Sequence, residues 1–258
     1  MAFDSLLLRR IQRDEVHAEP FPYLIKQEVV DPSVYAQLDA EFPDVMGYAH
    51  SSNKVNRHSI LFDTPQAAEI FGRSDAWREF RDQLLSPKFL SEVIDLFHDE
   101  LKRVYPQMAG NPRLVDDTEK EWLRSLYRMT RSFRESVYIQ ANFNMSGDGY
   151  AIGPHYDNPK KLAAGLMYFR EQDDTRSEGG DFLVLRKKKP DSPRVFDRMK
   201  DTVDDPELEI AARLPYGSNT FCFMFNGRNS LHAATDYQGH GRFRRFIYFD
   251  IGTFYRLF

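Results

Sequence analysis

Residues 149–159 read Gly-Tyr-Ala-Ile-Gly-Pro-His-Tyr-Asp-Asn-Pro, and the fold can be inferred outward from this stretch. Successive side chains of a β-strand point to opposite faces, so His155 and Asp157 point the same way and can hold one ion. A third ligand has to come from another strand, and His232 lies 75 residues downstream of Asp157. Two imidazoles and one carboxylate are the ligands of mononuclear non-haem iron(II), in which the opposite coordination positions stay open. A His-x-Asp pair is common by chance, so the surrounding sequence has to support this site.

The composition is that of a globular protein. The 258 residues suffice for one large domain or two small ones, and 41% of them are hydrophobic. A net charge of −4 gives no reason to expect a nucleic-acid partner. No apolar stretch approaches the roughly 18 residues of a membrane span, and the N-terminus lacks the apolar core and cleavage site of a signal peptide. We therefore expect a cytoplasmic protein that binds neither nucleic acid nor a membrane.

The first part of the chain, up to about residue 132, is predicted to be mostly helical. Residues 21–25 have the pattern of an opening strand. A helix is expected to follow Asp31-Pro32-Ser33, with Asp31 as its cap and proline at the first helical position. Amphipathic patterns with a 3.6-residue period predict further helices over 74–85, 87–105 and 117–131.

From about residue 134 the pattern changes to short strand-like runs separated by turns. The predicted strands are 135–144, 150–157, 163–170, 181–186, 209–213, 219–225, 229–233 and 243–252. Regularly spaced short strands are typical of a sandwich or barrel. The charged stretch 187–208 is expected to form a rim loop, which is either a lid or binding loop or an ordinary solvated surface.

Four separate blocks of the second part resemble the 2-oxoglutarate/iron(II)-dependent oxygenases, and within them the prolyl-hydroxylase-like branch. The blocks are 149–159, then 166–169 with 178–185, then 223–232, and finally 244–250. Their order and spacing extend the likeness over roughly residues 134–252. The resemblance implies a double-stranded β-helix, a distorted jelly roll with the metal at its open mouth. We therefore predict an α+β fold in one integrated domain, in which residues 1–132 pack on a core formed by 133–258.

The resemblance also implies the site. His155, Asp157 and His232 would hold Fe(II), with 2-oxoglutarate as cosubstrate and ascorbate as an optional further cofactor. Family members that transfer halide lack the carboxylate ligand, so Asp157 implies hydroxylation or a related oxidation.

An arginine fork suits the far carboxylate of 2-oxoglutarate, and Arg242, Arg244 and Arg245 are available after His232. Matching the family's strand favours Arg245 over Arg244, although strand alternation does not choose between them. Tyr168 matches a tyrosine that hydrogen-bonds the same carboxylate, with an ordinary core tyrosine as the alternative. Phe143 falls where the branch carries another pocket tyrosine, so that contact is missing here.

The implied activity is hydroxylation of an unactivated C–H bond, with release of succinate and CO2. The substrate could be a protein prolyl residue, an amino acid or another small molecule, and the polar stretch 48–60, which includes Arg57, is a candidate substrate-facing loop. One alternative is a cupin-like metal-binding protein that binds or isomerises a small molecule without 2-oxoglutarate. Another is a non-catalytic relative that serves as a binding or sensor module.

Overall fold

The computed structural model describes residues 3–47, 56–110, 112–116, 119–120 and 136–258. Its helices are α1 (Pro32–Ala40), α2 (Pro65–Arg73), α3 (Asp75–Leu84), α4 (Pro87–Leu96) and α5 (His98–Val104), with three-residue 3-10 turns at Arg13–Glu15, Val45–Gly47 and Pro106–Met108. Most of the predicted helix 117–131 lies outside the described residues. No helix among the described residues is long and apolar enough to cross a membrane.

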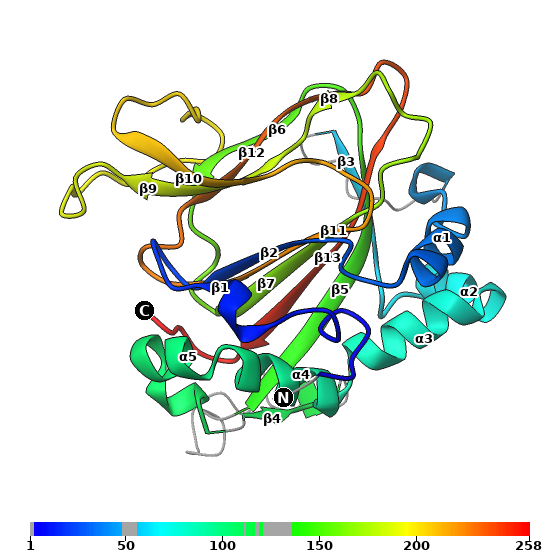
Figure 1. The fold of residues 1–258 in the computed structure, drawn as a ribbon, viewed down its shortest axis with the longest axis horizontal. Helices are drawn as coiled ribbons and strands as arrows, with labels where there is room; N and C mark the ends of the chain where they lie inside the picture. The colour runs from blue at the N-terminus through cyan, green and yellow to red at the C-terminus, as the bar shows by residue number, and fades with distance from the viewer. Residues whose placement is uncertain (1–2, 48–55, 111, 117–118, 121–135) are drawn as a thin grey trace.

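Two antiparallel sheets face each other (Figure 1). The larger sheet has the strand order β1-β2-β11-β7-β13-β5-β3, and β4 pairs with β5 in parallel. Its strands are β1 (Val16–His17), β2 (Tyr23–Gln27), β3 (Arg57–Leu61), β4 (Arg113–Leu114), β5 (Ser136–Ser146), β7 (Lys161–Tyr168), β11 (Thr220–Phe225) and β13 (Arg244–Thr253). The smaller sheet has the order β10-β9-β12-β6, with β8 paired to β12. Its strands are β6 (Tyr150–His155), β8 (Glu178–Gly179), β9 (Phe182–Lys187), β10 (Leu208–Leu214) and β12 (His232–Gln238).

The connectivity is that of a jelly roll. The chain passes from β5 in the larger sheet to β6 in the smaller one and returns to the larger sheet in β7. It then forms β9 and β10 in the smaller sheet, β11 in the larger, β12 in the smaller and β13 in the larger. The result is two interleaved four-stranded sheets, β5-β13-β7-β11 and β6-β12-β9-β10, as in double-sheet jelly rolls. The predicted double-stranded β-helix is therefore confirmed. Strands β2 and β3 widen the larger sheet, so the N-terminal part supplies strands as well as helices.

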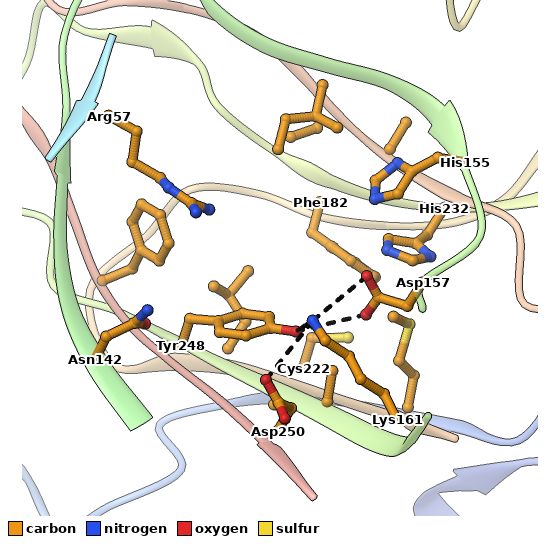
Figure 2. Close-up of a pocket in the computed structure, with 18 of the residues that line it drawn as sticks. Arg57, Asn142, His155, Asp157, Lys161, Phe182, Cys222, His232, Tyr248 and Asp250 are labelled. Carbon is orange, nitrogen blue, oxygen red and sulfur yellow. Dashed lines mark hydrogen bonds and ion pairs between the residues drawn. The ribbon is translucent and has the colours of Figure 1, made fainter. Parts of the chain in front are cut away.

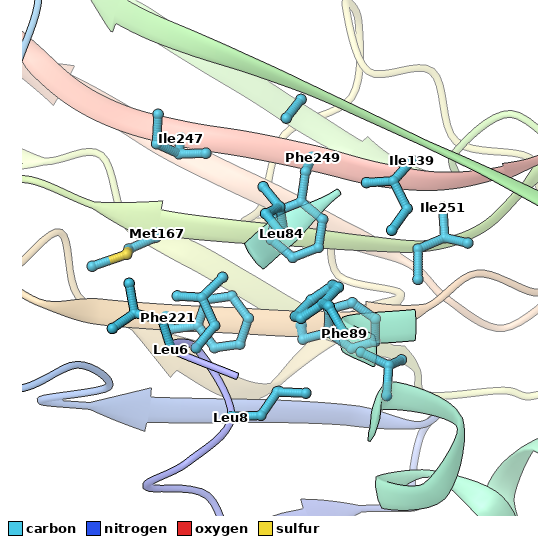
Figure 3. Close-up of a cluster of buried hydrophobic side chains, with 14 of the residues drawn as sticks. Leu6, Leu8, Leu84, Phe89, Ile139, Met167, Phe221, Ile247, Phe249 and Ile251 are labelled. Carbon is cyan, nitrogen blue, oxygen red and sulfur yellow. The ribbon is translucent and has the colours of Figure 1, made fainter. Parts of the chain in front are cut away.

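The main core lies between the larger sheet and the helices. On β13, Ile247, Phe249 and Ile251 point toward the helices and are fully buried. Figure 3 shows them packed against apolar side chains of the N-terminal segment and of helices α3 and α4. The alternate residues of β13 point the other way, into the space between the two sheets. One strand therefore belongs to both the core and the cavity.

Helix starts follow the cap-and-proline pattern. The side-chain oxygens of Thr64, Ser74 and Ser86 each accept a backbone N–H in the first turn of α2, α3 and α4. Asp31 occupies the cap position of α1, as predicted, but makes no side-chain capping bond. The predicted helix 87–105 is two helices, because the chain leaves helical geometry at Phe97.

Phe143 belongs to the core and not to the pocket. Its ring centroid lies 4.7 Å from that of Phe62 and 4.8 Å from that of Trp77, on the helix-facing side of β5. Its neighbour Asn142 points the other way and lines the cavity. Position 143, where the sequence predicted a missing pocket hydroxyl, therefore lies in an aromatic cluster of the core.

Removal of this ring should destabilise the protein without touching the cavity. We expect Phe143→Ala to lower the free energy of unfolding by about 3–5 kcal/mol, because it leaves a void among rings that cannot collapse. Urea titration followed by circular dichroism measures this. Phe243→Ala, at a residue that is 38% exposed, is the control and should change stability by less than about 1 kcal/mol. Equal effects of the two variants would contradict this account of the core.

Candidate active site

Two of the candidate metal ligands lie on neighbouring strands, and the third, Asp157, lies two residues beyond the end of β6. His155 ends β6 and His232 begins β12, and the antiparallel register of these strands places the two residues opposite each other. Their ring centroids are 4.3 Å apart. One ligand atom from each of His155, Asp157 and His232 lies within 4.8 Å of the others, so the structure brings the three predicted ligands together (Figure 2).

Backbone carbonyls fix both imidazole rings. His155 Nδ1 lies 2.8 Å from the carbonyl oxygen of Gly153, and His232 Nδ1 lies 2.9 Å from that of Ser230. Because a carbonyl oxygen only accepts hydrogen bonds, each Nδ1 carries the proton and each Nε2 keeps its lone pair. Metal-ligating histidines are commonly oriented in this way by a partner on the other ring nitrogen. The donor set therefore suits a divalent metal.

The electrostatics of the triad favour the protonation states that bind a metal. Burial, followed by repulsion from His232, lowers the pKa of His155 to about 4. Burial likewise lowers the pKa of His232. Burial acts to raise the pKa of Asp157, but attraction to Lys161 and to the two histidines outweighs it, so the pKa of this carboxyl is lowered. At neutral pH the site therefore offers two neutral imidazoles and one carboxylate.

Lys161, a residue that the sequence analysis did not single out, lies beside Asp157. Its Nζ is 3.6 Å from Asp157 Oδ1 and 3.6 Å from Asp250 Oδ2. It also donates a 2.6 Å hydrogen bond to the Tyr248 hydroxyl, which lies 3.5 Å from Asp157 Oδ2. Figure 2 shows these contacts converging on the lysine. Both oxygens of Asp157 have a polar neighbour, which restricts how the carboxylate can turn.

A cavity of about 300 Å³ opens between the two sheets beside the triad. Alternate residues of β13 line it, from Arg244 through Phe246 and Tyr248 to Asp250. Once the face of β13 that carries Arg244 is known to face the cavity, strand alternation predicts that Tyr248 and Asp250 face it too. Lys161 gave no such signal, because its position depends on how β7 and β13 pair.

Arg244 lies in the wall of this cavity, where it is 1% exposed. Its Nε donates a 2.7 Å hydrogen bond to the Gly180 carbonyl, and its Nη2 donates to the Tyr168 hydroxyl. Tyr168 is itself fully buried behind Arg244 and donates to the same carbonyl at 3.2 Å. Among the described residues, no carboxylate forms an ion pair with Arg244. A buried guanidinium without a counter-charge is costly unless a ligand supplies one.

Arg245 points to the opposite side of the sheet, and its choice as the cosubstrate anchor does not fit the structure. Its Nη2 lies 2.7 Å from Asp39 Oδ1 of α1, and its Nε donates to the Phe169 carbonyl. It is not among the residues that line the cavity. The structure places Arg244, and not Arg245, in the cavity wall, because adjacent strand residues face opposite sides and the sequence match did not show which side faces the cavity.

Two peripheral segments reach the cavity. Arg57 at the start of β3 lines it; this residue belongs to the polar stretch 48–60, of which 48–55 lie outside the described residues. Arg198, in the loop between β9 and β10, lines it too. The backbone of this loop packs on β6: Gly153 N–H donates to the Arg198 carbonyl at 2.9 Å, and a Cβ on Gly153 would meet the Asp201 carbonyl oxygen at 2.1 Å.

Comparison with known proteins finds likeness in structure alone. No protein-family profile and no curated protein matches the chain. A Pseudomonas putida prolyl-4-hydroxylase is 10% identical, with a TM-score of 0.48 over 90% of this chain and 92% of its own. A 2OG-Fe(II) oxygenase family oxidoreductase from Burkholderia pseudomallei is 12% identical, with a TM-score of 0.45 over 91% and 85%. HygX from Streptomyces hygroscopicus, solved with nickel and 2-oxoglutarate, is 11% identical, with a TM-score of 0.47 over 90% and 82%.

One of these structures is a prolyl-4-hydroxylase, one belongs to the 2OG-Fe(II) oxygenase family, and one holds 2-oxoglutarate. At such identities and scores they assign no activity to this chain, and the residues of the site have to carry the functional argument.

The lowered pKa of His155 predicts a pH-dependent stability of the metal-free protein. An unfolded histidine has a pKa near 6.5, so between about pH 6.5 and 4 the unfolded chain binds a proton that the folded chain does not. Stability therefore falls as the pH falls through this window. We expect a lower urea midpoint at pH 5 than at pH 7, and a smaller difference in His155→Gln. The exposed His240 supplies the control, since His240→Gln should retain the wild-type difference. A difference that His155→Gln leaves unchanged would argue against a neutral buried His155.

Proposed function

We propose that the protein is an iron(II)- and 2-oxoglutarate-dependent dioxygenase that hydroxylates a C–H bond of a second, prime substrate. One observation carries this proposal: a cavity holds a two-histidine, one-carboxylate donor set together with a buried arginine that has no counter-charge among the described residues. The two histidines and the carboxylate suit the metal, and the arginine suits the far carboxylate of the cosubstrate.

The triad would hold the metal through the Nε2 atoms of His155 and His232 and one oxygen of Asp157. Iron(II) bound there supplies the activation of dioxygen and of the 2-oxo acid. The protein contributes a fixed ligand geometry: two backbone carbonyls orient the rings, and Lys161 with Tyr248 flanks the carboxylate. Ascorbate remains a prediction from the sequence.

Arg244 would anchor the cosubstrate. Nε and Nη2 of Arg244 donate to Gly180 and Tyr168, and a carboxylate placed against the N–H groups that are left would replace water with charge-assisted hydrogen bonds. Tyr168 has a positioning role in this proposal, because its hydroxyl accepts from Arg244 and holds the guanidinium in the wall. The arginine and the triad line the same cavity, as one ligand that bridges them requires.

A cupin-like protein that works without 2-oxoglutarate is the alternative. Such a protein needs the metal ligands but has no use for a buried arginine without a counter-charge in the wall of the same cavity. The burial of Arg244 therefore favours the oxygenase, and titration of the cosubstrate separates the two.

The test is an anaerobic titration of the metal-free protein with Fe(II) and then 2-oxoglutarate, followed by the visible charge-transfer absorption. We expect a band in the wild type and none in His155→Ala. Arg244→Met should weaken 2-oxoglutarate binding at least tenfold, because one charge-assisted pair contributes about 1.5–3 kcal/mol. Arg245→Met is the matched control and should bind 2-oxoglutarate as the wild type does.

Two outcomes would contradict this assignment. Metal binding without any absorption band would favour the cupin-like alternative. A loss of affinity in Arg245→Met, with Arg244→Met unaffected, would return the anchor to Arg245.

Turnover gives a second test. Asp157→Ala should abolish Fe(II)-dependent conversion of 2-oxoglutarate to succinate, since the metal loses its charged protein ligand. Succinate release measures this, and circular dichroism checks that the variant is folded. Full activity in a folded Asp157→Ala protein would disprove the proposed role of the triad.

A further inference from the structure

The cavity wall carries more positive charge than the metal and cosubstrate sites use. Arg57, Lys161, Arg198 and Arg244 line it, against two carboxylates, Asp157 and Asp250. Each positive charge can be paired in turn with a nearby negative charge, which shows which cation has none. This step rests on the proposed function, because it counts the metal and 2-oxoglutarate as bound.

Most of these charges have a counter-charge. Lys161 lies 3.6 Å from Asp250 and 3.6 Å from Asp157. A divalent metal would be offset by Asp157 and by the oxo-acid end of 2-oxoglutarate, whose other carboxylate would offset Arg244. Arg57 and Arg198 then remain. Neither guanidinium forms an ion pair or a hydrogen bond with any residue that the structure describes.

Arg57 is the better placed of the two. It is half-buried at the start of the edge strand β3, and in the register of the sheet Ser146 of β5 lies between Arg57 and Arg244. Figure 2 shows its guanidinium pointing into the cavity from the side opposite the triad, while the ring of Tyr248, below Arg57 in this view, extends toward Asp157. Arg198 is exposed at the mouth, so it adds to the positive potential there and offers less of a fixed site.

We propose that the prime substrate carries an anionic group, a carboxylate or a phosphate, that Arg57 binds across the cavity from the metal triad. The guanidinium fork matches either anion in a bidentate manner, and partial burial strengthens the pair relative to one in open water. Anchoring at Arg57 leaves the rest of the substrate to lie along Tyr248 toward the metal. Among small-molecule substrates, this selects acids and phosphate esters over neutral compounds.

Nickel-loaded protein with saturating 2-oxoglutarate tests the proposal, because the cosubstrate then occupies Arg244. The probes are benzoate, phenyl phosphate and the neutral benzamide, titrated by calorimetry. Benzoate against phenyl phosphate distinguishes the two anions, and benzamide reports what the ring contributes without charge. The variants are Arg57→Met, which removes the charge at similar length, and Arg57→Lys, which keeps it. Arg9→Met, at an exposed arginine outside the cavity wall, is the control.

We expect at least one anion to bind tenfold or more tightly than benzamide. Arg57→Met should lose that preference, Arg57→Lys should retain part of it, and Arg9→Met should retain all of it. Equal binding of the anions and benzamide by the wild type, or undiminished anion binding by Arg57→Met, would overturn the proposal.

The affinity of each variant for 2-oxoglutarate separates this proposal from the one on which it rests. If the nickel-loaded wild type does not bind 2-oxoglutarate, the dioxygenase assignment itself is wrong. If Arg57→Met loses 2-oxoglutarate while Arg244→Met keeps it, Arg57 is the cosubstrate anchor and the substrate proposal is wrong.

Discussion

The pairing of β6 with β12 is the constraint on which the site depends. His155 and His232 are far apart in the chain and share no local signal, yet the register of these two strands places them opposite each other. A shift of one residue in that register would turn one of the imidazoles to the other face of the sheet. The jelly-roll connectivity brings the two strands together, because it places β12 between β9 and β6. The arrangement of the candidate metal ligands is thus a consequence of topology, and the carbonyls of Gly153 and Ser230 fix the orientation of the two rings.

The larger sheet separates two environments by the alternation of its side chains. On β13, Ile247 and Phe249 belong to the core beneath the helices, while Phe246 and Tyr248 face the cavity. The core side is apolar and packed with aromatic rings, so a charge there needs a partner, and Asp39 of α1 supplies one to Arg245. The cavity side holds the charge of Arg244, for which we propose the carboxylate of 2-oxoglutarate as the partner. The same chemical group, on adjacent residues, is therefore structural in one case and available for binding in the other.

Much of this architecture was predictable from the sequence, for reasons that differ by element. Most strands from β5 to β13 follow turn signals and apolar runs, although β12 overlaps the predicted 229–233 only at its start and β8 was not predicted. Helix α1 follows its cap position and proline, and α3 follows the 3.6-residue period of 74–85. His155 and Asp157 could be predicted as a pair because they lie two residues apart, although β6 ends at His155 and Asp157 follows the strand. The division of 87–105 into α4 and α5 depends on a change of backbone geometry at Phe97, which the hydrophobic period does not reveal. Arg244 could not be separated from Arg245 because both faces of β13 are apolar, and which face meets the helices is decided by the tertiary fold.

Lys161 illustrates why the finer details of the site could not be predicted from the sequence. It begins β7, and it meets Tyr248 and Asp250 only because β7 and β13 are paired. Burial, reinforced by the nearby Asp157, raises the pKa of Asp250, and Lys161 opposes that effect. A single ammonium thus lets two buried carboxylates stand near one metal position without both being neutralised by protons. This leaves Asp157 charged for the metal and consumes the charge of Lys161. The remaining cations of the wall, Arg244 deep in it and Arg57 on the opposite side from the triad, are consequently free to select ligands by charge.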